Sequence, residues 1–323
     1  MAYEHVPVLL NEVISHFSPL EPGSLICDAT FGGGGHTARL LELCSTCTLT
    51  AIDADPAMIE RGRERFGGTE RLLFRLGWFD EVLPTLVPHD RILMDLGISM
   101  MHMKEAGRGF ALRENGPLDM RLNPQCGDPA ADELLRRMSE REIADVLYHY
   151  GGERYSRRIA RALTEQGVPD TTGGFADLVW RAVPPGYRRG RNHPATRSFQ
   201  ALRIAVNDEL RRVERALPLA AARLRPGGRL GVITFHSLED RIVKHGFRYL
   251  AGGGDTARDA GRVVHPLAGD STQRADQPMY EDEGSFRVVT RKPVAPTEQE
   301  VAENAASRSA KLRVLERLAE EGE

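Results

Sequence analysis

A run of glycines and a distant aspartate are the residues of this chain whose types and spacing could do chemistry. Gly32 to Gly35 follow a short apolar segment and precede a helix-compatible one. Residues without side chains let backbone N–H groups approach a ligand at the start of a helix. Asp53 lies 21 residues after Gly32, about the ~20-residue offset at which such folds place the acid that binds ribose hydroxyls. The pair predicts a site for an adenosine-containing ligand.

Neighbouring residues narrow the choice of ligand. A dinucleotide fingerprint starting at Gly32 needs a third glycine where the chain has Thr37, and no lysine of a phosphate loop lies near. Asp28, just before the loop, would repel a pyrophosphate and suits a ligand with a positive end. S-adenosylmethionine combines an adenosine with a sulfonium and an ammonium. Two alternatives stay open: a nicotinamide-dependent oxidoreductase, and a tight turn that needs its glycines for packing alone.

Short apolar segments are the predicted strands that position these residues. They are 24–28, 49–53, 90–95 and 230–235. Helix-compatible stretches separate the first three, and alternating strands and helices form a parallel sheet whose ligands bind at the carboxyl ends of the strands. Asp28, Asp53 and Asp95 would therefore meet at one edge of an α/β sheet. His236 follows the last of these strands and is expected at the same edge.

Residues 104–206 have a different sequence pattern from these strand-forming segments. They carry amphipathic helical patterns and Pro/Gly turns, and no run typical of a parallel strand. We therefore expect a discontinuous sheet domain built from residues 1–103 and 207–323. Residues 104–206 would be inserted into it as a helical substrate-recognition domain.

Arginines concentrate near the end of this inserted segment. Between Arg181 and Arg215 there are nine arginines and three acids, a local surplus of six positive charges in a chain whose net charge is −3. Such a surplus indicates a local surface for phosphates. Tyr187 adds a ring for stacking, whereas Phe199 heads an apolar helical stripe that predicts core packing. The preferred phosphate contacts are Arg188, Arg189 and Arg191. The alternative is a solvated arginine loop.

Composition indicates an ordinary globular protein, with 41% hydrophobic and 28% charged residues. No apolar run is long enough to span a bilayer, and the N-terminus lacks the pattern of a signal peptide. We expect a cytoplasmic protein with no membrane partner. Cys44 and Cys47 have the spacing of a redox pair or half a zinc site, but no second pair completes such a site. We expect two thiols there, and no metal.

Longer stretches of the sequence resemble one known family. They include DATFGGGGHT, GPLDMRLNP, YGGERYSRRIARAL, HPATRSFQALRIAVNDEL, PGGRLGVITFHSLEDRIVK and SRSAKLRVLER, in the family's order. The family is that of the small-subunit ribosomal RNA methyltransferase H proteins, also called MraW. The resemblance implies a Rossmann-like class I S-adenosylmethionine-dependent methyltransferase fold with an inserted helical domain. It also implies methylation of the exocyclic N(4) amine of one cytidine in the decoding region of 16S rRNA.

The resemblance further implies partners and site residues. The partner is 16S rRNA within the small ribosomal subunit, and a homodimer is left open. Matched position by position, the family's cofactor contacts are Gly34, Gly35, His36, Asp53, Phe79 and Asp95. A seventh contact, a glutamine in the family, is His102 here. At that position an imidazole can donate or accept one hydrogen bond, but it does not offer both together as an amide does. A non-catalytic RNA-binding protein on the same fold is therefore a further alternative.

Two residues are the candidates for catalysis. Asp95, at the end of its strand, is the leading candidate to orient the amine or the cofactor, and the alternative is a helix cap. His236 follows a buried strand and could contact the base or its phosphate. The alternative for His236 is a satisfied buried side chain.

Overall fold

The computed structural model describes residues 7–112, 114–190, 192–253, 263–267 and 285–319. The chain divides into two compact units. Of the described residues, the first unit contains those up to Gly97, 210–253 and 285–319, and the second contains 98–209 and 263–267. The chain therefore passes to the second unit at 97/98 and back at 209/210, where the predicted boundaries are 103/104 and 206/207. Residues 263–267 also belong to the second unit, although the predicted sheet domain included all of 207–323.

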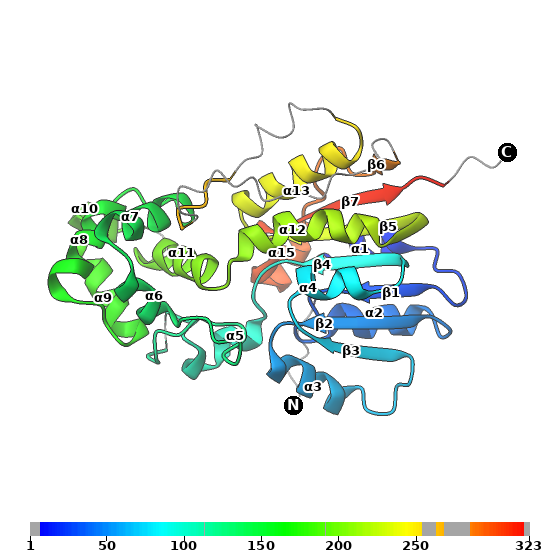
Figure 1. The fold of residues 1–323 in the computed structure, drawn as a ribbon, viewed down its shortest axis with the longest axis horizontal. Helices are drawn as coiled ribbons and strands as arrows, with labels where there is room; N and C mark the ends of the chain where they lie inside the picture. The colour runs from blue at the N-terminus through cyan, green and yellow to red at the C-terminus, as the bar shows by residue number, and fades with distance from the viewer. Residues whose placement is uncertain (1–6, 113, 191, 254–262, 268–284, 320–323) are drawn as a thin grey trace. The chain divides into compact units, whose positions relative to one another are not determined.

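The first unit is built on a seven-stranded sheet, counted over the described residues, with the order β3-β2-β1-β4-β5-β7-β6. Strands β1 to β5 pair in parallel, and β7 runs antiparallel to both β5 and β6. In Figure 1 the strands follow one another in this order from β3 at one edge of the sheet. The strands are β1 (Leu25–Asp28), β2 (Thr48–Asp53), β3 (Leu72–Leu76), β4 (His89–Asp95), β5 (Leu224–Thr234), β6 (Phe286–Val288) and β7 (Lys311–Arg317).

This topology confirms the predicted α/β, Rossmann-like class I methyltransferase fold. The four predicted strands correspond to β1, β2, β4 and the second half of β5. The helices of this unit are α1 (Leu10–Phe17), α2 (Gly35–Leu43), α3 (Pro56–Arg65), α4 (Phe79–Val82), η1 (Leu83–Thr85), α12 (Glu209–Ala222), α13 (Ser237–Leu250), α15 (Glu298–Glu303) and η3 (Ala305–Ser309).

Local signals explain where the helices of the sheet unit begin. Helix α3 has Asp55 as its N-cap, whose side chain accepts a hydrogen bond from Ala57 N at 2.9 Å, and Pro56 stands at the first helical position. Helix α2 begins directly after Gly34, which has a left-handed φ of 71°. The β1–α2 loop is thereby forced to turn sharply at the end of the strand.

The second unit is helical. Its helices are α5 (Met100–Lys104), η2 (Ala106–Arg108), α6 (Ala131–Arg137), α7 (Glu140–His149), α8 (Ser156–Gln166), α9 (Thr172–Ala182), α10 (Pro185–Arg188) and α11 (Thr196–Val206), of which α6 to α11 are drawn in green in Figure 1. Phe199 is 5% exposed, and its ring centroid lies 5.5 Å from that of Phe175. The predicted core role of Phe199 is confirmed. Within the described parts of both units, no helix has the length and apolar character needed to cross a bilayer.

Cys44 and Cys47 are joined by a disulfide, with their Cα atoms 5.4 Å apart. The expectation of two thiols is therefore wrong. Helix α2 ends at Leu43, and β2 begins at Thr48, so the intervening residues make a tight turn that brings both side chains together. The spacing alone does not reveal this turn.

Candidate active site

The predicted meeting of three aspartates at one edge of the sheet is confirmed. Asp28, Asp53 and Asp95 are the last residues of the neighbouring strands β1, β2 and β4. The loop after β1 is hydrogen-bonded to both neighbouring strands. Ala29 N donates to Leu93 O, and Phe31 N donates to Ile52 O, each at 2.8 Å. The glycine loop is consequently fixed by backbone bonds before any side chain contributes. We call the carboxyl ends of these strands, together with the loop, the carboxyl edge.

Asp53 holds the glycine loop directly. Its Oδ2 accepts a hydrogen bond from Gly32 N at 2.7 Å, and its Oδ1 accepts one from Asp55 N at 2.8 Å. A carboxylate offers about four lone-pair positions, so one such group can serve several donors at once. The acid predicted to bind a sugar therefore has a second task, which is to fix the loop.

Gly34 lacks a side chain because the protein itself fills the space. A Cβ atom on Gly34 would lie 2.7 Å from the ring of Phe31 and 2.9 Å from that of Phe66. Its φ of 71° is also one that residues with side chains rarely adopt. At Gly34 the structure therefore supports the alternative that the glycine is needed for packing within the protein. Gly35 and His36 open helix α2, whose first N–H groups have no acceptor within the helix.

Asp28 is a buried carboxyl group at the end of β1. The residue is 1% exposed, and its Oδ2 accepts a hydrogen bond from Thr37 Oγ1 at 2.7 Å. Burial raises the pKa of Asp28 to about 6, partly offset by the bond from Thr37 and further raised by the nearby charge of Asp53.

Asp95 has a carboxyl oxygen with nothing bound to it. Its Oδ1 is buried and has no hydrogen-bond partner among the described residues, although the side chain as a whole is 24% exposed. Burial raises the pKa of Asp95 well above its usual range, and the charges of Asp28 and Glu239 raise it further. The helix-cap alternative is wrong, because helix α5 is capped by Ser99, whose hydroxyl accepts from Met101 N. Asp95 is suited to accept a proton.

His36 lies beside that carboxyl group. Its Nε2 is 3.0 Å from Val8 O, and because a carbonyl only accepts, this nitrogen must donate. Its Nδ1 lies 3.6 Å from Asp95 Oδ2. In the neutral ring Nδ1 is an acceptor, and its distance from the carboxyl group is longer than a hydrogen bond. The predicted cofactor contact thus lies beside the candidate base.

Phe79 is the half-buried first residue of α4, in a segment fixed by two arginines. Asp80 is buried, and it accepts hydrogen bonds from Arg212 and Arg215, each at 2.9 Å. The guanidinium of Arg212 lies 4.0 Å from the ring centroid of Trp78. The arginine surplus of the sequence included both arginines as charges for RNA. In the structure, both side chains instead donate hydrogen bonds to Asp80.

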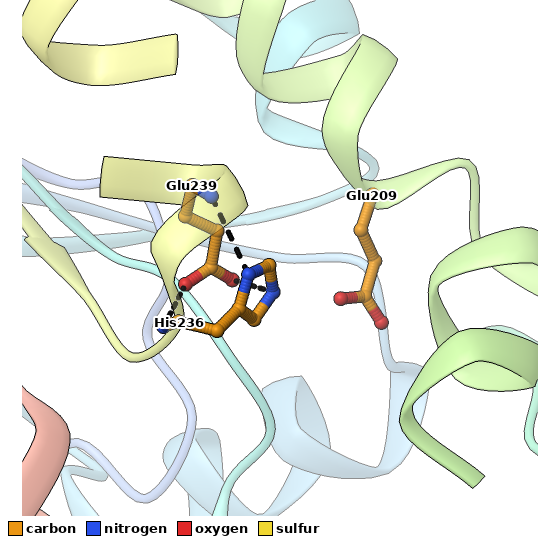
Figure 2. Close-up of side chains that lie close together, drawn as sticks. All are labelled: Glu209, His236 and Glu239. Carbon is orange, nitrogen blue, oxygen red and sulfur yellow. Dashed lines mark hydrogen bonds and ion pairs between the residues drawn. The ribbon is translucent and has the colours of Figure 1, made fainter. Parts of the chain in front are cut away.

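His236 is the N-cap of helix α13 (Figure 2). Its Nδ1 accepts from Glu239 N at 3.4 Å, while the buried Glu239 carboxylate accepts from Phe235 N at 2.7 Å and His236 N at 3.2 Å. This reciprocal arrangement is a capping box, for which the sequence His-Ser-Leu-Glu was the available signal. His236 therefore has a structural role as an N-cap. It is only half-buried, and its Nε2 lies 3.1 Å from Glu239 Oε1 without a hydrogen-bond partner among the described residues, so it is not the satisfied buried side chain of the alternative. Its catalytic role stays a prediction. Glu209, also drawn, pairs with Arg203 at 2.8 and 2.9 Å.

The remaining predicted residues belong to the second unit. His102 is 3% exposed, with its ring centroid 5.5 Å from that of Phe110. Arg188 donates to the carbonyls of Arg181 and Val183, so it caps the end of α9. Arg189 is exposed. Arg191 lies outside the described residues. The roles of these residues stay predictions.

The sequence matches the MraW methylase family over residues 2–318. The chain belongs to this family. Similar relatives include proteins named "Ribosomal RNA small subunit methyltransferase H" from Treponema denticola, 41% identical, from Methylorubrum extorquens, 45% identical, and from Nostoc punctiforme, 40% identical. The alignments cover 97%, 97% and 98% of this chain and 97%, 86% and 95% of those proteins, respectively.

Membership of the MraW methylase family makes the chain a methyltransferase that uses S-adenosylmethionine. The nicotinamide-dependent oxidoreductase left open by the glycine pattern is thereby set aside. The donor set of the carboxyl edge fits this cofactor. Asp53 provides a carboxylate at the end of β2, and the first turn of α2 provides backbone N–H groups that have no acceptor within the helix.

Proposed function

We propose that this protein transfers the methyl group of S-adenosylmethionine to the exocyclic N(4) amine of a cytidine in the decoding region of 16S rRNA. Support for an rRNA substrate comes from the relatives named as small-subunit rRNA methyltransferases, which align along nearly the whole chain. Support for amine chemistry comes from the buried Oδ1 of Asp95 at the end of β4, which no described residue hydrogen-bonds. That atom is the observation on which the proposed mechanism rests.

The chain's own residues would hold the cofactor at the carboxyl edge. Asp53 would accept hydrogen bonds from the ribose, and the backbone of Gly34, Gly35 and His36 would provide N–H groups at the start of α2. Phe79 would contribute a ring beside the cofactor. When bound, S-adenosylmethionine supplies a methyl group activated by its sulfonium. The alignment of donor and acceptor is then the main task of the protein.

Asp95 would act on the acceptor. The lone pair of a cytidine amine is delocalised into the ring, so a group must hold an N–H, localise the lone pair and remove a proton. Asp95 Oδ1 would accept that N–H, and the raised pKa of Asp95 makes it a stronger base than an exposed carboxylate. His36 Nδ1, 3.6 Å from Asp95 Oδ2, would lie beside this carboxyl group. His236 and His102 remain candidates for contacts with the base and the cofactor.

The inserted segment, residues 104–206, would recognise RNA. Arg188, Arg189 and Arg191 are the proposed phosphate contacts, and of the two that are described, Arg189 is the more exposed. The substrate would be the rRNA within the small ribosomal subunit, which places the protein in the cytoplasm. The cytidine would leave its stack to reach the reacting groups. A homodimer stays a prediction.

Labelled cofactor and nucleoside analysis test this function. The purified chain is incubated with methyl-labelled S-adenosylmethionine and small subunits that lack the modification, and the rRNA is digested and analysed by mass spectrometry. The expected product is cytidine carrying one additional methyl group on N(4). A label on another nucleoside would refute the proposed target. RNA binding without any label would favour the non-catalytic alternative.

A further inference from the structure

Aromatic rings and arginines gather around the short helix α10 of the second unit. The residues that form what we call the α10 surface are Arg154, Tyr155, Trp180, Tyr187, Arg188 and His193. Tyr187 and Arg188 are neighbours at the end of α10. Tyr187 packs against Tyr155, and Arg188 lies over Trp180. Helix α10 therefore connects two groups of aromatic side chains, one around Trp180 and one around Tyr155. Four separate segments of the second unit contribute to the surface.

Trp180 is the centre of the first group. It is 38% exposed, and its ring stacks on that of His193 with centroids 5.6 Å apart and planes at 27°. The guanidinium of Arg188 lies 5.7 Å from the Trp180 centroid and is held by the carbonyls of Arg181 and Val183. Trp180 therefore has fixed neighbours while much of the residue remains accessible.

His193 is fixed in the same way. Its Nδ1 accepts a hydrogen bond from Ala195 N at 3.2 Å, and its carbonyl accepts one from Thr196 N at 3.0 Å. Both bonds are at the start of helix α11. The indole and the imidazole thus form a stacked pair whose orientation is set by the ends of two helices, α9 and α11.

Tyr155 and Tyr187 form the second group. Their ring centroids are 5.0 Å apart at 71°, and the guanidinium of Arg154 lies 5.8 Å from each. The hydroxyl of Tyr187 donates to the fully buried Glu153 at 2.9 Å. The negative charge of Glu153 is therefore covered, and the surface presents rings and guanidinium groups.

This chemistry fits single-stranded RNA. Trp180 is 38% exposed beside His193 and Arg188, so part of a large, rigidly held ring is accessible. Base–aromatic stacking is the sequence-tolerant contact that proteins make with unpaired bases. Arg189 follows α10 directly and is exposed, which places a positive charge beside the rings. Asp177, one turn before Trp180 on α9, is an exposed acid in the same region. Phosphates are therefore expected on the α10 side of Trp180.

We propose that Trp180 is a stacking platform for an unpaired base of the RNA substrate, with Arg189 contacting a neighbouring phosphate. This inference rests on the proposed function and specifies how the second unit would hold the RNA. No motif of the sequence indicated Trp180, because its partners come from other segments.

Fluorescence provides a test that does not depend on methyl transfer. The chain has two tryptophans. Trp78 is 7% exposed in the first unit, whereas Trp180 is exposed. A single-stranded fragment of the target rRNA should quench the emission of Trp180 on binding. The quenching should disappear in Trp180→Phe, whose RNA affinity should fall less than that of Trp180→Ala, because a flat ring is retained.

Affinity and salt dependence complete the test. Trp180→Ala should weaken binding of the fragment by roughly 5- to 100-fold, without changing the slope of log Kd against log salt concentration. Tyr148→Ala is the matched control, since Tyr148 is 57% exposed in the same unit and outside the α10 surface. Its affinity should equal that of the wild type. S-adenosylhomocysteine should bind all variants equally, which shows that they fold.

The outcomes separate this inference from the proposed function. If the wild type methylates and binds RNA, and Trp180→Ala behaves like Tyr148→Ala, the stacking platform is wrong and the function stands. Quenching that persists in Trp180→Phe would also refute it. If Trp180→Ala methylates naked rRNA normally but fails on assembled subunits, the surface binds a protein and the inference is wrong. If the wild type neither binds nor methylates RNA, both proposals are wrong.

Discussion

The carboxyl edge of the sheet and the α10 surface hold their charged groups in opposite ways. At the edge, the buried Asp28 accepts a hydrogen bond from the hydroxyl of Thr37, and Asp53 accepts hydrogen bonds from backbone N–H groups. At the α10 surface, the guanidinium groups of Arg154 and Arg188 lie over aromatic rings that are partly exposed. The first arrangement fixes charged groups at the edge assigned to the small cofactor, whereas the second leaves rings and positive charge accessible, as the proposed contact with RNA requires.

The two regions also differ in how well their residues could be predicted from the sequence. The residues of the edge follow strands, and their spacing is set by the strand–loop–helix repeat. The residues of the α10 surface come from four segments between 154 and 193. Their approach depends on how the helices pack, which leaves no fixed spacing in the sequence.

Replacing Asp95 should have the largest effect of any change at the edge. Asp95→Asn removes the proposed proton acceptor and should lower methyl transfer by about 10²- to 10⁴-fold, with a much smaller change in cofactor affinity. Single-turnover rates and equilibrium binding measure the two quantities. Asp90→Asn, at the opposite end of β4, is the control and should retain turnover. Turnover of Asp95→Asn within threefold of the wild type would remove Asp95 from the mechanism.

Asp28 should make the stability of the protein depend on pH. Its pKa is about 6 in the folded protein and 3.8 ordinarily, so the folded state binds the proton more tightly than the unfolded state. The stability that this proton contributes is present below the ordinary pKa and is lost as the pH rises through about 6. Between pH 4.5 and 8 the wild type should lose about 2 kcal/mol from this group.

The variant Asp28→Asn isolates that contribution. Because an amide does not titrate, the free energy of unfolding of Asp28→Asn should rise relative to the wild type by about 2 kcal/mol over the same interval. Urea denaturation at both pH values measures the difference. An equal difference between the two proteins at pH 4.5 and 8 would show that Asp28 is not a buried acid with a raised pKa.

Arg212 tests whether an arginine that lies over an aromatic ring in the first unit supports cofactor binding, and not RNA binding as proposed for the α10 surface. Arg212→Met should lower stability by about 1–2 kcal/mol, since buried Asp80 loses a charged partner. It should also weaken cofactor binding severalfold, because Phe79 adjoins this contact. RNA affinity should not change. Arg215→Met is the matched control, because Arg215 binds the same carboxylate but is 45% exposed. Equal effects of both variants would contradict a role for the contact with Trp78.

Arg189 should have the smallest effect and the most specific signature. Arg189→Ala should reduce the slope of log Kd for single-stranded RNA against log salt concentration by about 0.7, with a loss of affinity of only a few-fold. Arg141→Ala, whose side chain is 92% exposed in the same unit, is the control. An unchanged slope, or the same change in the control, would exclude Arg189 as a phosphate contact.

Much of the fold and part of the site could be predicted from the sequence. Strands ending on Asp28, Asp53 and Asp95 were visible because each apolar run is short and ends on an acid. The order of the strands in space was implied only by the family resemblance. The antiparallel β7 between β5 and β6 was not foreseen, because pairing order is set by contacts between distant segments.

What the sequence could not provide was the state of each side chain. It identified Asp28 but not its burial, and it counted Arg212 as a charge for RNA although it binds Asp80. It assigned thiols to Cys44 and Cys47, where a tight turn forms a disulfide. Each of these outcomes depends on three-dimensional neighbours that no spacing encodes.

Calorimetry of cofactor binding tests the central claim most directly. S-adenosylmethionine should bind the wild type with measurable heat, and Asp53→Ala should weaken binding roughly 100-fold, the combined effect of two hydrogen bonds to a charged group. Asp53→Asn should be intermediate, since it retains an acceptor for Gly32 N. No heat with the wild type, or equal affinity in Asp53→Ala, would contradict the assignment of the carboxyl edge as the cofactor site.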